Sequence, residues 1–246
     1  PIKSSAASDV YKRQAACMEY PHNRPYTADD LVRIITLLRD PVNGCPWDKV
    51  QTHTSIRMNF LEEAYEAVDA LDLDDPVLMC EELGDVLMQV AFHTCMEQET
   101  GRFTWEQVCD GVCQKLIERH PNIFGTQPGY EGITDWDALK NKEKGRRTLA
   151  DDLESVPRAM PALMRAAKLQ KRAARHGAAL QGADAAALAD AAENLQTAQP
   201  ASAQAEQAVG KLLFAAANLA RQAGVDPEQA LQKANEAFCT AAGPVA

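Results

Sequence analysis

The stretches Leu61-Glu-Glu-Ala-Tyr-Glu66 and Glu81-Glu-Leu-Gly-Asp-Val-Leu87 decide the fold of this chain. Each lies in a run with the apolar spacing of a helix, the first over about 54–71 and the second over about 77–99. A short turn at Asp72–Pro76 separates the two runs. We therefore predict an antiparallel helical hairpin with carboxylates on both arms.

The spacing of these carboxylates predicts that they converge. Residues three apart share a helix face, so Glu63 pairs with Glu66 and Glu82 pairs with Asp85. If the turn is centred on Asp74, position 63 lies level with 85, and 66 lies level with 82. Two carboxylates about 6 Å apart repel by roughly 3 kcal/mol at an effective dielectric near 20, so a cation is expected among them. Oxygen ligands favour Mg²⁺, with Mn²⁺ as the alternative, over zinc.

The alternative reading of the acidic stretch is a solvent-exposed face without a ligand. The first helix has an apolar stripe opposite its glutamates, made of Leu61, Ala64, Tyr65 and Val68. The second helix, in contrast, is apolar nearly all round after Asp85, which predicts that it is buried. Because buried charges need a partner, the two helices together favour a metal site over surface decoration.

The rest of the chain reads as helical, and no stretch alternates like a strand. Helices are expected over about 27–39, with Thr27 as N-cap, over 105–119, around Trp136 and over 162–176. We predict an all-α helical bundle in four parts. These are a disordered or artefactual tail (1–26), a first domain (27–125), a loop and basic connector helix (126–176), and an Ala-rich second domain (177–246).

A weak internal repeat links the two domains. The stretch Gly84–Phe92 aligns with Gly210–Asn218, which predicts two tandem copies of one helical unit. The acidic positions of the first copy correspond in the second to Ala192, Glu193, Gln196, Ala208 and Lys211. Only one of the five is acidic, so we expect any activity to come from the first domain.

Charge and cysteine content restrict the class of protein. The net charge is −10, and 14 of the 35 acidic residues lie between Phe60 and Asp110. Such a field repels nucleic acid and anionic lipid, so neither is an expected partner. Seven cysteines without a CxxC pair indicate reduced thiols, and no apolar run reaches 18 residues. We therefore expect a soluble, cytoplasmic protein without a membrane partner.

Basic and aromatic residues outside the acidic stretch are candidates for binding a phosphorylated ligand. Lys115 and Arg119 are four apart on one helix face, where they would hold a phosphate chain or merely complement the helix dipole. Trp47 offers a flat surface for a base, with Lys49 and Arg57 nearby, although a tryptophan after a proline is as often a core residue.

Several motifs, in order, resemble one known family. They are CPWD (Cys45–Asp48), LEEAYE (Leu61–Glu66), EELGDVL (Glu81–Leu87), TGRF (Thr100–Phe103) and KLIERHPNIFG (Lys115–Gly125). Together they resemble the MazG nucleoside triphosphate pyrophosphohydrolases, and the resemblance extends from about Asp29 to Phe238. It implies an all-α, usually dimeric, Mg²⁺-dependent enzyme that hydrolyses NTPs and dNTPs to the monophosphate and pyrophosphate, a house-cleaning activity on nucleotide pools.

The resemblance also implies roles for individual residues. The metal ligands would be Glu63, Glu66, Glu82 and Asp85. Glu62 would be a further catalytic carboxylate beside Glu63, and we assign to it the proton of the attacking water. Lys115 and Arg119 would bind the triphosphate.

The degenerate second copy keeps another class of function open. Tandem members of the family carry a second set of acidic motifs, and some rely on it for activity. The alternative hypothesis is therefore a catalytically weak nucleotide-binding or regulatory scaffold. A carboxylate-bridged iron bundle is disfavoured, because the sole ExxH pattern, Glu19–His22, lies in a proline-containing tail.

Overall fold

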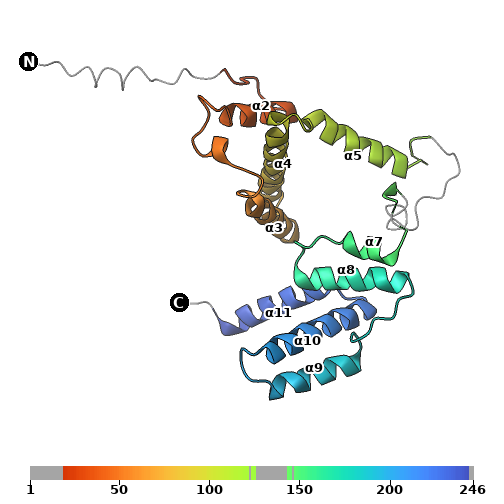
Figure 1. Cartoon of the computed structure of the whole chain (residues 1–246). Helices are drawn as coiled ribbons and strands as arrows, with labels where there is room; N and C mark the ends of the chain where they lie inside the picture. The colour runs from red at the N-terminus through yellow and green to blue at the C-terminus, as the bar shows by residue number, and fades with distance from the viewer. Residues whose placement is uncertain (1–18, 122, 126–142, 146, 244–246) are drawn as a thin grey trace, which may run out of the picture. The chain divides into compact units, whose positions relative to one another are not determined.

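The computed structural model describes residues 19–121, 123–125, 143–145 and 147–243. Within these ranges every regular element is a helix, which confirms the predicted all-α class (Figure 1). The chain divides into two compact units, residues 1–132 and 133–246. The helix expected around Trp136 and the first part of the N-terminal tail lie outside the described residues.

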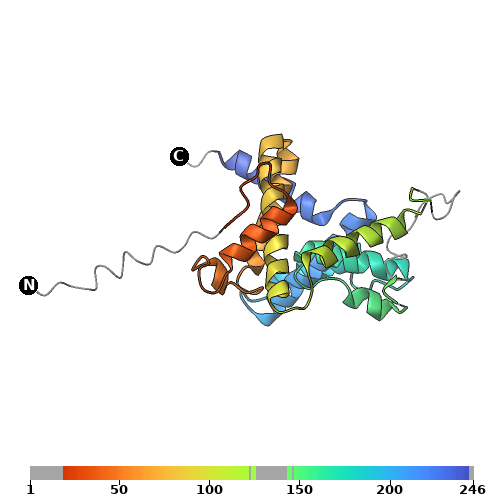
Figure 2. The ribbon, with the colours of Figure 1, turned by 90° about the horizontal axis from the view of Figure 1, so that it is seen from above.

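The first unit is built around a helical hairpin. Its arms, α3 (Arg57–Leu73) and α4 (Pro76–Glu99), pack along each other. Both α2 (Ala28–Leu38) and α5 (Trp105–Arg119) also contact α4, and a short 3-10 helix, η1 (Asp48–Val50), lies between α2 and α3 (Figure 1, Figure 2). The predicted hairpin is confirmed, with α4 as the central helix of the unit.

Local capping sets the ends of these helices. Thr27 and Thr104 form capping boxes with the residues three positions later, so α2 and α5 begin where predicted. Asp74 ends α3 in the left-handed conformation, and Asp75 caps α4 ahead of Pro76. α3 begins three residues later than the predicted Thr54, because the Thr52 and Ser55 hydroxyls accept hydrogen bonds from each other's backbone N–H groups.

The core of the first unit lies around the second half of α4. It joins residues of α2, α4 and α5 with Ile56, and consists of Val32, Ile35, Ile56, Ala91, Phe92, Cys95, Met96 and Trp105. The first half of α4 is different, because Leu83 is 51% exposed and Leu87 is 40% exposed. The prediction that α4 is buried nearly all round after Asp85 is therefore wrong at Leu87, which faces outward, whereas Ala91, Phe92, Cys95 and Met96 are buried as expected.

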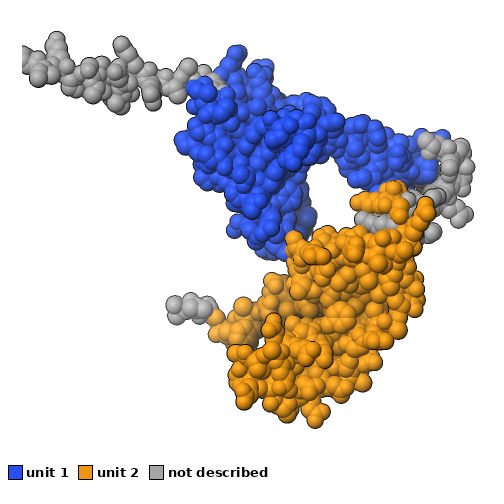
Figure 3. Space-filling model, in the orientation of Figure 1, with its two compact units in different colours: residues 1–132 blue, residues 133–246 orange. Residues whose placement is uncertain are grey.

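The second unit is drawn in orange in Figure 3. Its described part contains five helices. They are α7 (Leu149–Glu154), α8 (Ala162–Arg175), α9 (Ala185–Thr197), α10 (Ala203–Gln222) and α11 (Pro227–Ala242). α10 contacts α8, α9 and α11. The connector helix predicted at 162–176 is thus α8, and it packs into the second unit instead of standing apart as a linker.

Buried polar contacts explain why α8 belongs to this unit. The Gln170 side chain donates a 2.7 Å hydrogen bond to the carbonyl of Phe214 in α10. In the same C-terminal half of α8, Arg172 and Arg175 approach the Asp152 carboxylate of α7 at 3.1 and 2.6 Å. Asp152 is 1% exposed, so its contacts with Arg172 and Arg175 compensate a buried charge and hold α7 against α8.

The order of packing partners is similar in the two units. α4 contacts α2, α3 and α5, and α10 contacts α8, α9 and α11. This recurrence agrees with the tandem repeat, which stays a prediction. None of the helices that the structure describes combines the length and the apolar character needed to cross a membrane.

Candidate functional site

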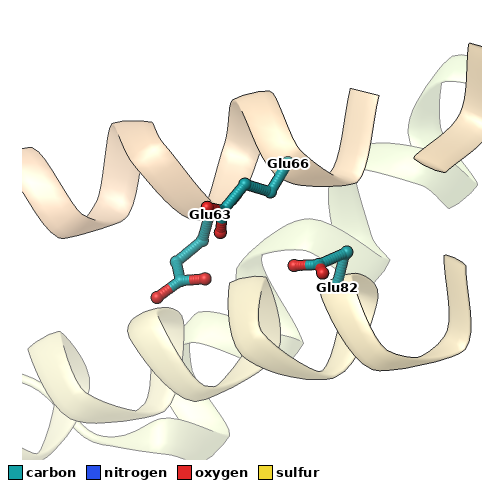
Figure 4. A group of neighbouring side chains, drawn as sticks. All are labelled: Glu63, Glu66 and Glu82. Carbon is teal, nitrogen blue, oxygen red and sulfur yellow. The ribbon is translucent and has the colours of Figure 1, made fainter. Parts of the chain in front are cut away.

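Three carboxylates converge between the arms of the hairpin. Glu63 and Glu66 of α3 and Glu82 of α4 each place an oxygen within 4.8 Å of the others (Figure 4). Figure 4 shows the side chains directed into the space between the two helices. Two helices and a turn are therefore enough to gather three acidic groups at one point.

The register of the hairpin agrees with the predicted level pairs. The pKa of Glu63 is raised, first by burial and next by the charge of Asp85. The pKa of Glu82 is also raised, again first by burial and next by the charge of Glu66. Asp85 thus lies close enough to act on both glutamates, although it is not one of the three residues whose oxygens lie within 4.8 Å.

The face of α3 that meets α4 differs from the predicted one. Tyr65 and Val68, expected in the apolar stripe, are 54% and 50% exposed. The buried residues are Ala67 and Ala70, and Glu63 lies one turn before them on the same face. Small alanines let α4 approach closely, so Glu63 is drawn into the interface and half-buried. Of the three glutamates in this stretch, Glu63 therefore lies partly within the helix interface, whereas Glu62 and Glu66 are exposed.

The donor set fits a hard divalent cation. All three groups are carboxylates, and among the described residues no basic side chain forms an ion pair with them. Their mutual repulsion and partial burial favour protonation, as the raised pKa values of Glu63 and Glu82 indicate. A bound cation relieves the same repulsion, and oxygen donors suit Mg²⁺ or Mn²⁺.

A buried glutamine next to the carboxylates was missed at the sequence level. Gln89 of α4 is 7% exposed, and its Nε2 donates to Glu63 Oε1 at 3.4 Å. It belongs to a polar row at four-residue spacing on α4, formed by Asp85, Gln89, His93 and Glu97. The four-residue spacing of these polar residues, within a helix that is otherwise apolar, is the sequence signal that could have identified Gln89.

The row continues into a second polar cluster that the sequence analysis did not predict. His53 Nδ1 lies 2.7 Å from His93 Nδ1, and the two rings are stacked. His53 Nε2 lies 2.5 Å from Glu97 Oε1, and Arg102 also pairs with Glu97 at 2.7 Å. Burial, followed by the neighbouring His53, lowers the pKa of His93. This cluster ties the segment before α3 to α4.

Arg39 fixes the loop that carries the CPWD motif. Its guanidinium pairs with Glu99 through two hydrogen bonds of 2.5 and 2.8 Å. It also donates to the carbonyls of Asp48 and Gln51. Within the same loop, a Cβ on Gly44 would lie 2.4 Å from the Asp40 carbonyl oxygen, so the turn leaves no room for a larger residue.

The other predicted binding residues are not gathered at the carboxylates. Trp47 is 56% exposed, so it is a surface residue and not a core plug. Lys49 lies in η1 and is half-buried, and Arg57 is exposed at the start of α3. Glu62 is exposed and lies one turn before Glu66.

The two cations of α5 lie away from the hairpin in the single chain. Lys115 is exposed and Arg119 is 9% exposed, both near the C-terminal end of α5. α5 diverges from α3 and α4 after its first turns (Figure 1, Figure 2). The structure therefore does not bring the predicted phosphate-binding pair to the predicted metal ligands.

Comparison with known proteins adds independent information. The profile of the MazG nucleotide pyrophosphohydrolase domain matches residues 51–124, which include all three clustered carboxylates. A nucleoside triphosphate pyrophosphohydrolase of Escherichia coli (strain K12) is 41% identical over 219 residues, covering 85% of this chain and 83% of that protein.

Two further relatives carry similar names. A nucleoside triphosphate pyrophosphohydrolase/pyrophosphatase MazG of Thermotoga maritima is 39% identical over 212 residues, which cover 85% of this chain and 82% of that protein. A nucleoside triphosphate pyrophosphohydrolase of Mycobacterium tuberculosis is 35% identical over 151 residues, 60% of this chain and 46% of that protein.

Proposed function

Because the chain belongs to the MazG family of nucleotide pyrophosphohydrolases, we propose that it hydrolyses nucleoside triphosphates to the monophosphate and pyrophosphate. The active site is assigned to the first unit, between α3 and α4. The observation that carries this assignment is the convergence of Glu63, Glu66 and Glu82 inside the matched domain. In the second unit the corresponding positions retain one acid, Glu193.

The proposed chemistry follows from the donor set. Glu63, Glu66 and Glu82 would hold the metal, with Asp85 beside them. Mg²⁺ or Mn²⁺ held there would supply positive charge next to the phosphate oxygens and would lower the pKa of a water molecule. Glu62, exposed one turn before Glu66, accepts the proton of this water. The water oxygen bonds to phosphorus as the anhydride between the α and β phosphates breaks, and pyrophosphate leaves.

Nucleotide binding is assigned to residues of the first unit outside the carboxylate cluster. Trp47 presents an exposed ring on which a base can stack, with Lys49 and Arg57 in the adjoining segments. Lys115 and Arg119 are proposed to hold the triphosphate. Since α5 diverges from the hairpin, this contact requires either a shift of α5 or the α5 of a second copy (Figure 1).

A second copy of the chain is the proposed partner. Apolar side chains project outward from both arms of the hairpin: Tyr65, Val68, Leu83 and Leu87, each at least 40% exposed. Pairing two hairpins would bury these residues and give a homodimer with a four-helix centre.

The described cysteines are free, as suits the reducing cytoplasm, where we place the protein.

The function is tested by product analysis. The protein is incubated with Mg²⁺ and a panel of NTPs and dNTPs, and anion-exchange chromatography resolves the products. We expect monophosphate and pyrophosphate in equal amounts, and Mn²⁺ is expected to substitute for Mg²⁺. Glu63→Gln removes one ligand charge and should abolish turnover, whereas Glu193→Gln, at the corresponding position of the second unit, should leave it unchanged.

The same experiment separates the enzyme from the scaffold hypothesis. A folded protein that binds nucleotide but releases no pyrophosphate would be a nucleotide-binding or regulatory scaffold. Turnover that survives Glu63→Gln would place the chemistry outside the first hairpin.

A further inference from the structure

Gln89 is a polar residue at a buried helix position, where an apolar side chain is the usual choice. It lies on α4 one turn after Asp85, and 93% of it is removed from solvent. Its Nε2 donates to Glu63 Oε1 at 3.4 Å. Its Oε1 is buried and has no hydrogen-bond partner in the described part of the chain. Burying an amide with one end unsatisfied costs stability, so the residue needs another explanation.

The internal repeat offers a comparison. In the alignment of Gly84 with Gly210, Gln89 corresponds to Ala215, which is 0% exposed. The position is therefore buried in both units, but it is polar only in the unit that has the carboxylate cluster. This difference points to a role that depends on the carboxylates and not on the packing of the helix.

The orientation of the amide is consistent with such a role. An amide N–H directed at a carboxylate fixes the rotation of that carboxylate about its own axis, and partners of this kind tune the ligands of metal sites. Reversing the amide would place Oε1 against Glu63 Oε1, and two acceptors would then face each other. The contact with Glu63 thus orients the amide so that Oε1, and not Nε2, is the end without a hydrogen-bond partner in the described part of the chain.

We propose that Gln89 is a positioning residue of the metal site, an inference that rests on the proposed function: its Nε2 holds Glu63 in the orientation that ligates the cation. Glu66 and Glu82 have no comparable buried amide donor among the described residues. Gln89 therefore acts through Glu63 and does not touch the cation itself.

The test measures metal binding without nucleotide. Binding of Mn²⁺ to the metal-free protein is followed by electron paramagnetic resonance of the free ion. Gln89→Met keeps the length and burial of the side chain but removes the donor, and we expect it to weaken Mn²⁺ binding by about 10-fold or more. The matched control is Gln98→Met, an exposed position on the same helix, which should bind Mn²⁺ like the unaltered protein.

A second variant separates positioning from packing. Gln89→Ala leaves a cavity and lowers the melting temperature, whereas Gln89→Met does not. Both should lose the same Mn²⁺ affinity, and both should recover turnover when Mg²⁺ is raised to saturation. Mn²⁺ affinity that follows the melting temperature, or that is unchanged in Gln89→Met, would overturn the inference. If the unaltered protein fails to bind Mn²⁺, it is the proposed function that fails.

Discussion

Glu63 owes its properties to the face of α3 on which it lies. It shares that face with Ala67 and Ala70, so its carboxylate is half-buried and level with Asp85. Glu66 lies three residues further on, and Glu82 reaches the same point from α4. The three charges repel one another when no cation is present. The cluster therefore destabilises the metal-free protein and favours binding of a cation.

Neutralising one of these charges should stabilise the metal-free protein. Because Glu66, Glu81 and Asp85 all raise the pKa of Glu82, as does burial, Glu82→Gln removes repulsion. We expect its melting temperature without metal to rise by a few degrees, and the further rise on adding Mg²⁺ to shrink. Differential scanning fluorimetry with and without Mg²⁺ measures both, with Glu193→Gln as the control. Equal responses to Mg²⁺ in the two variants would argue against a site at Glu82.

His93 gives the first unit a pH-dependent stability. Its pKa is lowered in the folded protein, chiefly by burial and then by His53, while Glu97 opposes the shift. The unfolded chain therefore binds more protons below about pH 6.5, and stability falls as the pH drops through this value toward the folded pKa. His93→Gln should make the unfolding free energy less dependent on pH between 7 and 5.

Urea unfolding at several pH values measures this effect. The groups facing His93 are His53, Glu97 and the Phe60 ring, and Arg102 reaches the same cluster through Glu97. These charges remain in the variant, so the difference between the two pH profiles isolates His93. Parallel profiles would show that its protonation does not contribute.

At the level of elements, the hairpin turn sets the register on which the site depends. Asp74 ends α3 with φ of 53°, and Asp75 starts α4 with its side chain accepting from two backbone N–H groups. Both features are local, and both act on the angle and offset between the arms. Inserting or deleting one residue in this turn would rotate Glu82 away from Glu66.

Loss of the α4 cap should therefore be measurable. The carboxylate of Asp75 accepts hydrogen bonds from the N–H groups of Val77 and Leu78 at 2.9 and 3.2 Å. Asp75→Ala should lower the free energy of unfolding by about 1 kcal/mol, and Asp75→Asn, which retains an acceptor, by clearly less. Chemical denaturation compares the two. The cap has no role if both variants lose the same stability.

At the scale of the whole molecule, the two units differ in chemistry and not in class of fold. Each has a central helix contacted by three others, yet among the described residues the carboxylate cluster lies in the first unit alone. Tyr65, Val68, Leu83 and Leu87 of the hairpin are exposed in the described part of the chain. The proposed dimer would bury them.

The dimer is tested by sedimentation. The unaltered chain of 26.8 kDa should sediment at twice that mass. A Val68→Glu/Leu87→Glu double variant places charges on both arms and should shift the protein to the monomer. Leu231→Glu, at an equally exposed position on α11, should remain dimeric. A monomeric unaltered protein would exclude the proposed pairing.

The sequence by itself determined the helices, the hairpin and the convergence of the acidic residues. These features depend on local signals, such as the N-cap at Thr27 and the turn at Asp72–Pro76, and on fixed helical spacing, which places Glu63 level with Asp85 once the turn is located. The family resemblance was likewise contained in short motifs whose order along the chain is specific.

Only the tertiary structure decided which faces are covered. Tyr65 and Val68 have the spacing of a core-facing apolar stripe, so helical periodicity predicted the wrong buried face of α3. Gln89 is an ordinary helix residue, so periodicity did not indicate that its side chain is buried. Burial depends on what the neighbouring helix brings to each face: α4 packs against the small side chains of Ala67 and Ala70, and Glu63 and Gln89 are enclosed with them. The positions of Lys115 and Arg119 depend in the same way on the direction of α5, which their sequence does not encode locally.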